Sequence, residues 1–270
     1  MTFRVLFWNI EDFAGGKART ESVVGHIRAT DPDVVGICEV RDKTELRKVI
    51  GGHFKDFDFA ITDGDQEVEL AVGWRRGLFD QTLFTQRREF KTDNPDLRPG
   101  ALLSVQRNGG TYNILFLHAD SGRKIKDYSN RLQVFDHVWS LKASLDRIDG
   151  GDAKLIVMGD FNTMGHDATN DHGALHGNKE IRALDRAANK RGMNLLSKSD
   201  DNSFLQVHDG EIKFAADLDH ALISRSVSLA KTEKGARVMV RGWVDGKTEQ
   251  EQIDFVEGLS DHASIEVIVE

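Results

Sequence analysis

Short apolar runs, often alternating with polar positions, predict a chain rich in β-strands. In the last run, Ile265, Val267 and Val269 fall on one face, while Ser264 and Glu266 fall on the other. Other runs are short and apolar throughout. We expect strands at Phe3–Trp8, Val34–Cys38, Phe57–Ile61, Leu70–Trp74, Ala101–Val105, Tyr112–Leu117, Lys154–Met158, His220–Ile223, Arg237–Val240 and Ala263–Val269.

Helical periodicity appears in fewer segments. The clearest is Ser129–Asp146, in which Leu132, Phe135 and Val138 recur at helical spacing behind Ser129 as the predicted N-cap. Glycine, proline and capping residues delimit the others. These are Thr20–Ala29, ending before Asp31-Pro32; Thr44–Ile50, capped by Asp42 with Glu45; and Lys179–Arg191, closed by Gly192.

So many strands beside so few helices predict two sheets packed face to face, with helices covering both outer faces. This is a mixed α/β (α+β) class, a two-sheet β-sandwich in four layers. The chain has 270 residues, 39% of them hydrophobic, which is enough for a large core. No shift in composition divides it, so we expect one domain over residues 1–270.

Charge and cysteine content narrow the function classes. The formal net charge is −8 and no long basic run occurs, so tight nonspecific binding of nucleic acid is disfavoured, although a local basic patch is compatible with this charge. One cysteine, Cys38, cannot form an intrachain disulfide. We expect no leader peptide and no membrane-spanning segment, and we expect a cytoplasmic protein with no obligate protein partner.

Polar residues gather where apolar strands end or begin. Strand ends in a layered fold converge on one rim, so these side chains can meet despite their separation in sequence. A single polar residue after a strand is usually a turn former, but this set combines carboxylates, amides and imidazoles. Its members are Asn9, Glu11, Glu39, His118, Asp120, Asp160, Asn162, Asp219, His220, Asp261 and His262.

Several of these side chains suit a hard divalent cation. Carboxylates of Glu39, Glu11 and Asp261, with the amide oxygen of Asn9, are ligands of the kind that Mg²⁺ prefers. Zinc would be expected to recruit more histidine or cysteine. We therefore predict a Mg²⁺ site in which Mn²⁺ can substitute.

Six short motifs now carry a family resemblance. "WNIE", "ICEV", "LHAD", "GDFN", "LDHALIS" and "SDH" occur in the order found in the endonuclease/exonuclease/phosphatase superfamily, whose members are similar to deoxyribonuclease I. The match runs from Asn9 to His262, and "GDFN" together with "SDH" is its most specific part. The resemblance implies the deoxyribonuclease I-like four-layer fold.

The resemblance also implies a mechanism. The histidine at the position of His262 assists attack of water on a phosphoester, and an aspartate like Asp219 orients its ring. Glu39 resembles the main metal ligand, with the other predicted oxygen ligands close by. Asp160 and Asn162 resemble the pair that positions the attacking water and grips the phosphate.

His118 separates branches of the superfamily. Abasic-site endonucleases carry a tyrosine motif here, whereas deoxyribonuclease-like, sphingomyelinase-like and several phosphatase members carry histidine, so "FLHAD" points away from abasic-site repair. In deoxyribonuclease I this histidine protonates the leaving group and pairs with a glutamate. Glu69 is a poorly aligned counterpart of that glutamate.

Weaker signals concern substrate binding. Arg98 and Asp120 are candidates to contact substrate, although an exposed arginine or a turn-forming aspartate has the same pattern. Lys124, with Lys126 and Arg131, forms either a local basic rim or a solvated helix start. The loop with His166, His172 and His176 fits no standard zinc spacing, and we expect it to shape the substrate site.

Three functions remain open at this stage. The leading one is a Mg²⁺- or Mn²⁺-dependent phosphodiesterase acting on nucleic acid, with DNA as the expected substrate. The second keeps the chemistry but acts on a small phosphoester, such as a nucleotide, a sugar or inositol phosphate, or a lipid head group, and predicts an enclosed pocket. The third is a binding module that has kept the scaffold and lost the reaction.

Overall fold

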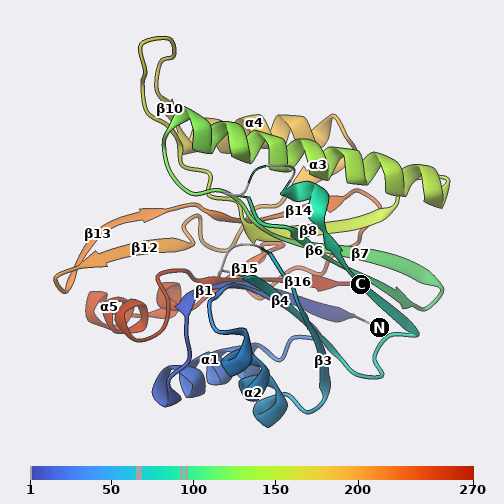
Figure 1. Ribbon diagram of the computed structural model, residues 1–270, viewed down its shortest axis with the longest axis horizontal. Coiled ribbons are helices and arrows are strands. Elements are labelled where there is room, and N and C mark those ends of the chain that lie inside the picture. Colours follow the sequence, from blue (N-terminus) through green and yellow to red (C-terminus); the bar gives the residue numbers. More distant parts are fainter. Residues whose placement is uncertain (1, 65–68, 92–93, 95–96) are drawn as a thin grey trace.

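Two six-stranded sheets pack face to face, and helices cover both outer faces in the computed structural model (Figure 1). The structure describes residues 2–64, 69–91, 94 and 97–270. Helices α1 and α2 lie against the first sheet, and α3 and α4 against the second (Figure 1). The predicted four-layer sandwich is confirmed.

The first sheet runs in the order β15-β16-β1-β2-β4-β3. Its strands are β15 (Met239–Arg241), β16 (Ser264–Val269), β1 (Phe3–Phe13), β2 (Val34–Val40), β4 (Glu69–Arg75) and β3 (Phe57–Ile61). Only β1 and β2 are parallel among its described pairs, and helix α1 (Lys17–Thr30) joins them.

The second sheet repeats this plan in the order β11-β14-β8-β7-β6-β5. Its strands are β11 (Met193–Leu195), β14 (Asp219–Ser224), β8 (Lys154–Asp160), β7 (Gly110–His118), β6 (Gly100–Arg107) and β5 (Gln81–Arg87). Its central pair β7-β8 is parallel and is connected by helix α3 (Ile125–Asp149). Each sheet therefore contains one β-α-β unit with its carboxyl ends at a shared rim.

The remaining elements lie outside the two large sheets. Two short hairpins, β9-β10 and β12-β13, precede and follow helix α4. They comprise β9 (Gly165–His166), β10 (Leu175–His176), β12 (Phe204–His208) and β13 (Glu211–Ala216). The other helices are α2 (Lys43–His53), α4 (Gly177–Asn189), α5 (Glu249–Gly258) and the 3-10 turns Arg88–Phe90 and Trp243–Asp245.

The strand pattern places the core in three layers. Alternate residues of β1 belong to two of these layers. Phe7 packs between the sheets, whereas Leu6 and Trp8 face helices α1 and α2. Gly36 permits the close approach of the sheets, because a Cβ there would lie 2.3 Å from the ring of Phe116. The third layer, between the second sheet and helices α3 and α4, includes Phe135.

Several boundaries differ from the sequence prediction. Ser129 lies inside α3, because the helix begins earlier and the Lys124 backbone N–H donates to Asp127 Oδ2 (2.9 Å). The predicted cap of α2 is confirmed: Asp42 accepts hydrogen bonds from the backbone N–H of Thr44 and Glu45 (both 2.9 Å). Strand β5, the β12-β13 hairpin and helix α5 were not predicted. In the described part of the chain, no helix has the length and apolarity needed to cross a membrane.

Candidate active site

The two β-α-β units bring the predicted polar strand ends to one rim. The carboxyl ends of parallel strands meet at the same edge of a sheet, and an antiparallel neighbour begins there. Strand β14 begins opposite the end of β8, with Asp219 paired to Asp160. The rim thus carries Asn9 of β1, Glu39 of β2, His118 at the end of β7, Asp160 at the end of β8, Asp219 at the start of β14 and His262 just before β16.

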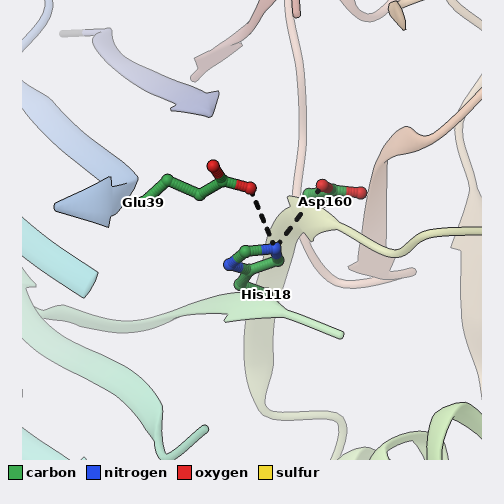
Figure 2. A group of neighbouring side chains, drawn as sticks. All are labelled: Glu39, His118 and Asp160. Atoms are coloured by element: carbon green, nitrogen blue, oxygen red, sulfur yellow. Dashed lines mark ion pairs between the residues drawn. The ribbon is translucent and has the colours of Figure 1, made fainter. Parts of the chain in front are cut away.

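Glu39, His118 and Asp160 form the first group at this rim, and Figure 2 shows both carboxylates directed at the imidazole. His118 Nε2 lies 3.5 Å from Glu39 Oε1 and 3.7 Å from Asp160 Oδ2. The Asn9 amide joins the carboxylates, since its Nδ2 donates to Glu39 Oε1 (3.0 Å) and to Asp160 Oδ2 (3.1 Å). Asn9 thus holds the two acids together from opposite sheets.

Asp160 also belongs to a second group, with Asp219 and His262. His262 Nδ1 lies 2.8 Å from Asp219 Oδ2, and its Nε2 lies 3.7 Å from Asp160 Oδ2. The Trp8 indole donates to the His262 carbonyl (2.9 Å), and the His262 N–H donates to Ser260 Oγ (3.1 Å). The imidazole is therefore fixed at its backbone and at one ring nitrogen, with its other nitrogen facing the site.

The remaining predicted residues border these groups. The Asp261 N–H donates to Glu11 Oε2 (3.2 Å), and Asp261 Oδ1 lies 3.9 Å from His262 Nε2. The Asn162 N–H donates to Asp160 Oδ1 (3.0 Å), and its side-chain amide donates to the Ala119 carbonyl (3.0 Å). Asn162 thereby orients the shared carboxylate.

Backbone strain concentrates at this rim. Glu11, Asp12, Glu39 and Asn162 adopt positive φ angles of 43°, 48°, 63° and 50°, which are uncommon for residues other than glycine. The first three lie where the β1-β2 register shifts between Asn9 and Phe13. Such strain is retained when the surrounding structure enforces it, and it is concentrated at functional sites.

Burial and mutual repulsion shift the pKa values of the acids. Burial raises the pKa of Asp160 to about 7, with the positive charge of His262 opposing the shift and the carboxylates of Asp219 and Glu39 adding to it. Burial likewise raises the pKa of Asp261 to about 7, again opposed by His262 and reinforced by neighbouring carboxylates. Asp160 and Asp261 are therefore buried from water and repelled by neighbouring carboxylates.

The two histidines behave in opposite ways. Burial disfavours the charged form of His262, but Asp219, Asp160 and Asp261 outweigh it and raise its pKa to about 10. Burial, with the charges of Arg98 and His262, lowers the pKa of His118 well below its usual value. The rim therefore holds one imidazolium and one neutral imidazole among several carboxylates.

The donor set fits a divalent cation. Asp261 Oδ1 and Asp219 Oδ1 are buried without a hydrogen-bond partner, which is costly for a carboxylate oxygen unless a positive charge compensates it. Oxygen ligands predominate, as Mg²⁺ and Mn²⁺ require. A cation bound near Glu39 and Asp261 would supply the compensating charge.

The weaker substrate candidates lie in different surroundings. Arg98 is half-buried beside His118, and its Nε is buried without a hydrogen-bond partner. Asp120 accepts a hydrogen bond from Asn130 of α3 (2.7 Å), as expected of a residue that fixes a turn. Lys124 is exposed at the start of α3.

Two other expectations are corrected. Arg131 is fully buried and cannot belong to a basic rim or a solvated helix start. Glu69 accepts hydrogen bonds from Thr62 Oγ1 and the Gly64 N–H and forms an ion pair with Lys43, so it does not pair with His118.

The histidine loop shows no metal-binding geometry. Among the described residues, the clusters with three ligand atoms in reach of one cation include none of His166, His172 and His176. His166 is buried against the Tyr128 ring, 5.0 Å between ring centroids.

Sequence reasoning missed residues that support the site. Ser260 Oγ donates to the Asn9 carbonyl (2.7 Å) while it accepts from His262, and its place beside Asp261 in "SDH" was the signal available. Ser203 Oγ accepts from the Asp219 N–H (2.8 Å), and no local pattern pointed to it. Both serines fix backbone segments that carry site residues.

The fold and the rim together define a class of protein. It has two sheets packed face to face between helices, and carboxylates and imidazoles gather at one edge of the sheets. The chain matches the Endonuclease/Exonuclease/phosphatase family over residues 6–262 and belongs to that family of phosphoesterases. A search of curated proteins gave no match.

Solved structures with the same fold have low sequence identity to this chain. TDP2 from D. rerio, complexed with a single-strand DNA product, is 13% identical with a TM-score of 0.65 over 100% of this chain and 99% of that one. TDP2 from Caenorhabditis elegans is 14% identical, with a TM-score of 0.68 over 100% and 74%. A mannosyl-6-phosphatase from Bacteroides thetaiotaomicron is 15% identical, with a TM-score of 0.61 over 99% and 98%.

Proposed function

We propose that this protein is a Mg²⁺-dependent phosphodiesterase whose favoured substrate is DNA, and that residues 1–270 form its catalytic domain. The observation that carries the proposal is that Asp160 belongs to both groups at the rim, the one with Glu39 and His118 and the one with Asp219 and His262. A cation ligand, a proton acceptor and an imidazolium thus lie within reach of one phosphorus centre.

Glu39 would hold the cation, with Glu11 and Asp261 completing its oxygen ligands and Asn9 keeping Glu39 in place. The cation would neutralise phosphoryl oxygens and the leaving oxyanion. Glu39 is fixed for this role, because its Oε2 accepts a hydrogen bond from the Asp12 N–H (3.0 Å) and its Oε1 accepts one from Asn9.

Asp160 would accept the proton of the attacking water, since its carboxylate is buried, held by Asn162, and directed into the site. His262 would bind a phosphoryl oxygen through Nε2, because Nδ1 is engaged by Asp219. Neutral His118 would donate to the phosphate or the leaving oxygen, beside Arg98.

DNA is favoured by the likeness to TDP2, a structure of which holds a single-strand DNA product. A small phosphorylated molecule is the second candidate. Two observations favour it: the net charge of −8 would repel a long polyanion, and a cavity of about 630 Å³ adjoins the rim. The mannosyl-6-phosphatase among the similar structures acts on such a molecule, according to its name.

A substrate panel tests the proposal. Plasmid, single-stranded DNA, RNA, nucleotides and sugar and inositol phosphates are incubated with Mg²⁺, Mn²⁺ or chelator. We expect cation-dependent cleavage of DNA, abolished by His262→Ala. Cleavage of a small ester alone would move the function to the second candidate, and equal hydrolysis by the wild type and His262→Ala would reject the site.

The cytoplasm remains the proposed location. Its support is that Cys38, the one cysteine of the chain, is buried and unpaired.

A further inference from the structure

An apolar cavity adjoins the catalytic rim and is not used by the proposed chemistry. Its volume is about 630 Å³, within the usual range for small-ligand sites. It lies between the start of α4, the loop after β8 and the β12-β13 hairpin. Figure 1 shows this hairpin projecting from the sheets beside α5, away from the chain termini.

The cavity is lined by residues that are adjacent to the reacting groups. Two of its lining residues, Thr163 and Leu218, directly follow Asn162 and directly precede Asp219. A third, Phe204, packs edge-on against the His262 ring, with centroids 5.1 Å apart. A phosphoester held by His262 would therefore extend one of its substituents toward this cavity.

We infer that this cavity, the aromatic pocket, binds a planar aromatic group carried by the phosphoester, and that the group is a nucleobase. The inference rests on the proposed phosphoesterase function and specifies its substrate. Phe204 and Phe214 supply the ring surfaces, with centroids 5.8 Å apart and planes at 45°. Ile181 and Met164 extend the apolar lining.

The lining distinguishes a base from a polyol. A sugar or inositol carries hydroxyl groups around its whole ring, so some of them would have to lie against the apolar surfaces of Phe204, Phe214 and Leu218, where no hydrogen-bond partner is available. A base instead presents its faces to these rings, as bases do in proteins that bind single-stranded nucleic acid through aromatic side chains.

The lining also distinguishes a base from an alkyl chain. Polar side chains, among them Asn178, Asn202 and Asp201, line the same cavity and can pair with the amide and amine edges of a base. An alkyl group would form no hydrogen bond with these side chains. In addition, Phe214 is a large apolar side chain that is 50% exposed, as is common at ligand-binding surfaces.

Direct binding to the 270-residue chain in Mg²⁺ tests the inference. Isothermal titration calorimetry compares thymidine 5′-monophosphate, phenyl phosphate, ribose 5-phosphate and hexyl phosphate, while phosphate release is monitored to detect turnover. We expect thymidine 5′-monophosphate to bind about tenfold more tightly than ribose 5-phosphate and hexyl phosphate. Tighter binding of phenyl phosphate than of the nucleotide would retain an aromatic occupant but overturn the base.

Variants locate the effect. Phe214→Ala should weaken binding of the nucleotide about tenfold and leave that of ribose 5-phosphate unchanged, while Phe214→Tyr should keep the preference. Leu83→Ala removes a comparably exposed apolar side chain, 64% exposed, on the distant edge strand β5 and should change nothing. Equal affinity for the nucleotide and ribose 5-phosphate, absence of binding, or equal weakening of both by Phe214→Ala would overturn the inference.

These outcomes are separate from the proposed function. If His262→Ala abolishes cation-dependent hydrolysis but the base adds no affinity, the chemistry stands and the pocket assignment fails. If the base adds affinity but no ester is hydrolysed, the pocket stands as a binding site and the proposed function fails.

Discussion

Two groups of buried charge in this protein differ in how completely their atoms are paired. Arg131 of α3 and Glu180 of α4 form a double hydrogen-bonded ion pair, at 2.8 and 3.0 Å. Arg131 also donates to the carbonyls of Asp120, Gly122 and Gly165, and the Gly165 N–H donates to Glu180. Neither charged side chain has a buried atom without a partner.

The candidate active site has the opposite character. Asp219, Asp261 and His118 each keep a buried polar atom without a hydrogen-bond partner, and carboxylates outnumber cationic groups. A fully paired buried ion pair is a structural device, whereas a buried surplus of one charge requires a ligand of the opposite charge. The pairing of Arg131 is that of a residue that stabilises the fold, whereas the unpaired atoms at the rim belong to residues that we propose bind a cation and a substrate.

Glu39→Gln should give the largest effect and should act on catalysis. Loss of one ligand charge should lower cation-dependent hydrolysis by on the order of 10³-fold, because charge on the phosphoryl group would be less well neutralised. Rates are measured on the substrate that the panel identifies, with Glu211→Gln, an exposed carboxylate, as the control. Stability in chelator should stay within about 1 kcal/mol of the wild type.

A large loss of stability in Glu39→Gln would show that Glu39 is a structural residue. The contrast between the candidate active site and the Arg131–Glu180 pair would then fail. Undiminished hydrolysis by a stably folded Glu39→Gln protein would remove it from the cation site.

Arg131→Met should act on stability and leave the chemistry intact. Removing one partner leaves the Glu180 carboxylate buried without its cation, which costs about 3–5 kcal/mol. Urea denaturation of the wild type, Arg131→Met and the exposed control Arg147→Met on the same helix measures this cost. Equal stabilities of all three would show that the pair contributes nothing to the fold.

Asp261→Asn should stabilise the protein in chelator by about 1 kcal/mol at pH 8, because it removes a buried carboxylate with an unpaired oxygen. The wild-type pKa of about 7 lies above the unfolded value, so this carboxyl favours folding at low pH and loses that contribution as pH rises through 7. The gain should therefore be smaller at pH 5, where the folded-state carboxyl is protonated, than at pH 8. Exposed Asp171→Asn serves as the control. If Asp261→Asn were less stable than the wild type in chelator at pH 8, the rim would not hold a destabilising surplus of negative charge.

His26 provides a test of comparable size that lies away from both groups of buried charge. It packs on the Trp8 ring, 4.4 Å between centroids, and lies 2.9 Å from Ser264 Oγ. Burial lowers its pKa to about 4, so its neutral form contributes stability above pH 6.5 that is lost as pH falls toward 4. The free energy of unfolding of the wild type should fall between pH 7 and pH 4.5. In His26→Gln this fall should be smaller by about 1 kcal/mol, as measured by denaturation at both pH values. An unchanged pH profile would show that His26 is not held neutral.

The sequence predicted the sandwich and the rim because buried strands and their polar ends leave local signals. The parallel pairs β1-β2 and β7-β8 were apolar enough to recognise, and their ends carry Glu39, His118 and Asp160. The roles of these residues in catalysis stay predictions until they are tested.

Other elements were missed for physical reasons. Strand β5 lies at a sheet edge with half-exposed or exposed residues, so it lacks an apolar run. The β12-β13 hairpin is exposed on much of its surface, although Asp209-Gly210 is a recognisable hairpin turn with positive φ at both residues. Helix α5 had a capping signal in Thr248 and Glu251. The close pairing of Asn9 with both Glu39 and Asp160 depends on tertiary packing that no local pattern specifies.

Cation binding tests the charge surplus most directly. Mn²⁺ is titrated into the wild type, Glu39→Gln and Arg131→Met, and free Mn²⁺ is followed by electron paramagnetic resonance at a temperature at which all three are folded. We expect the wild type and Arg131→Met to bind Mn²⁺ with equal affinity and Glu39→Gln to bind it at least about tenfold more weakly. Equal affinity of the wild type and Glu39→Gln, or no binding by the wild type, would contradict a cation site at this rim.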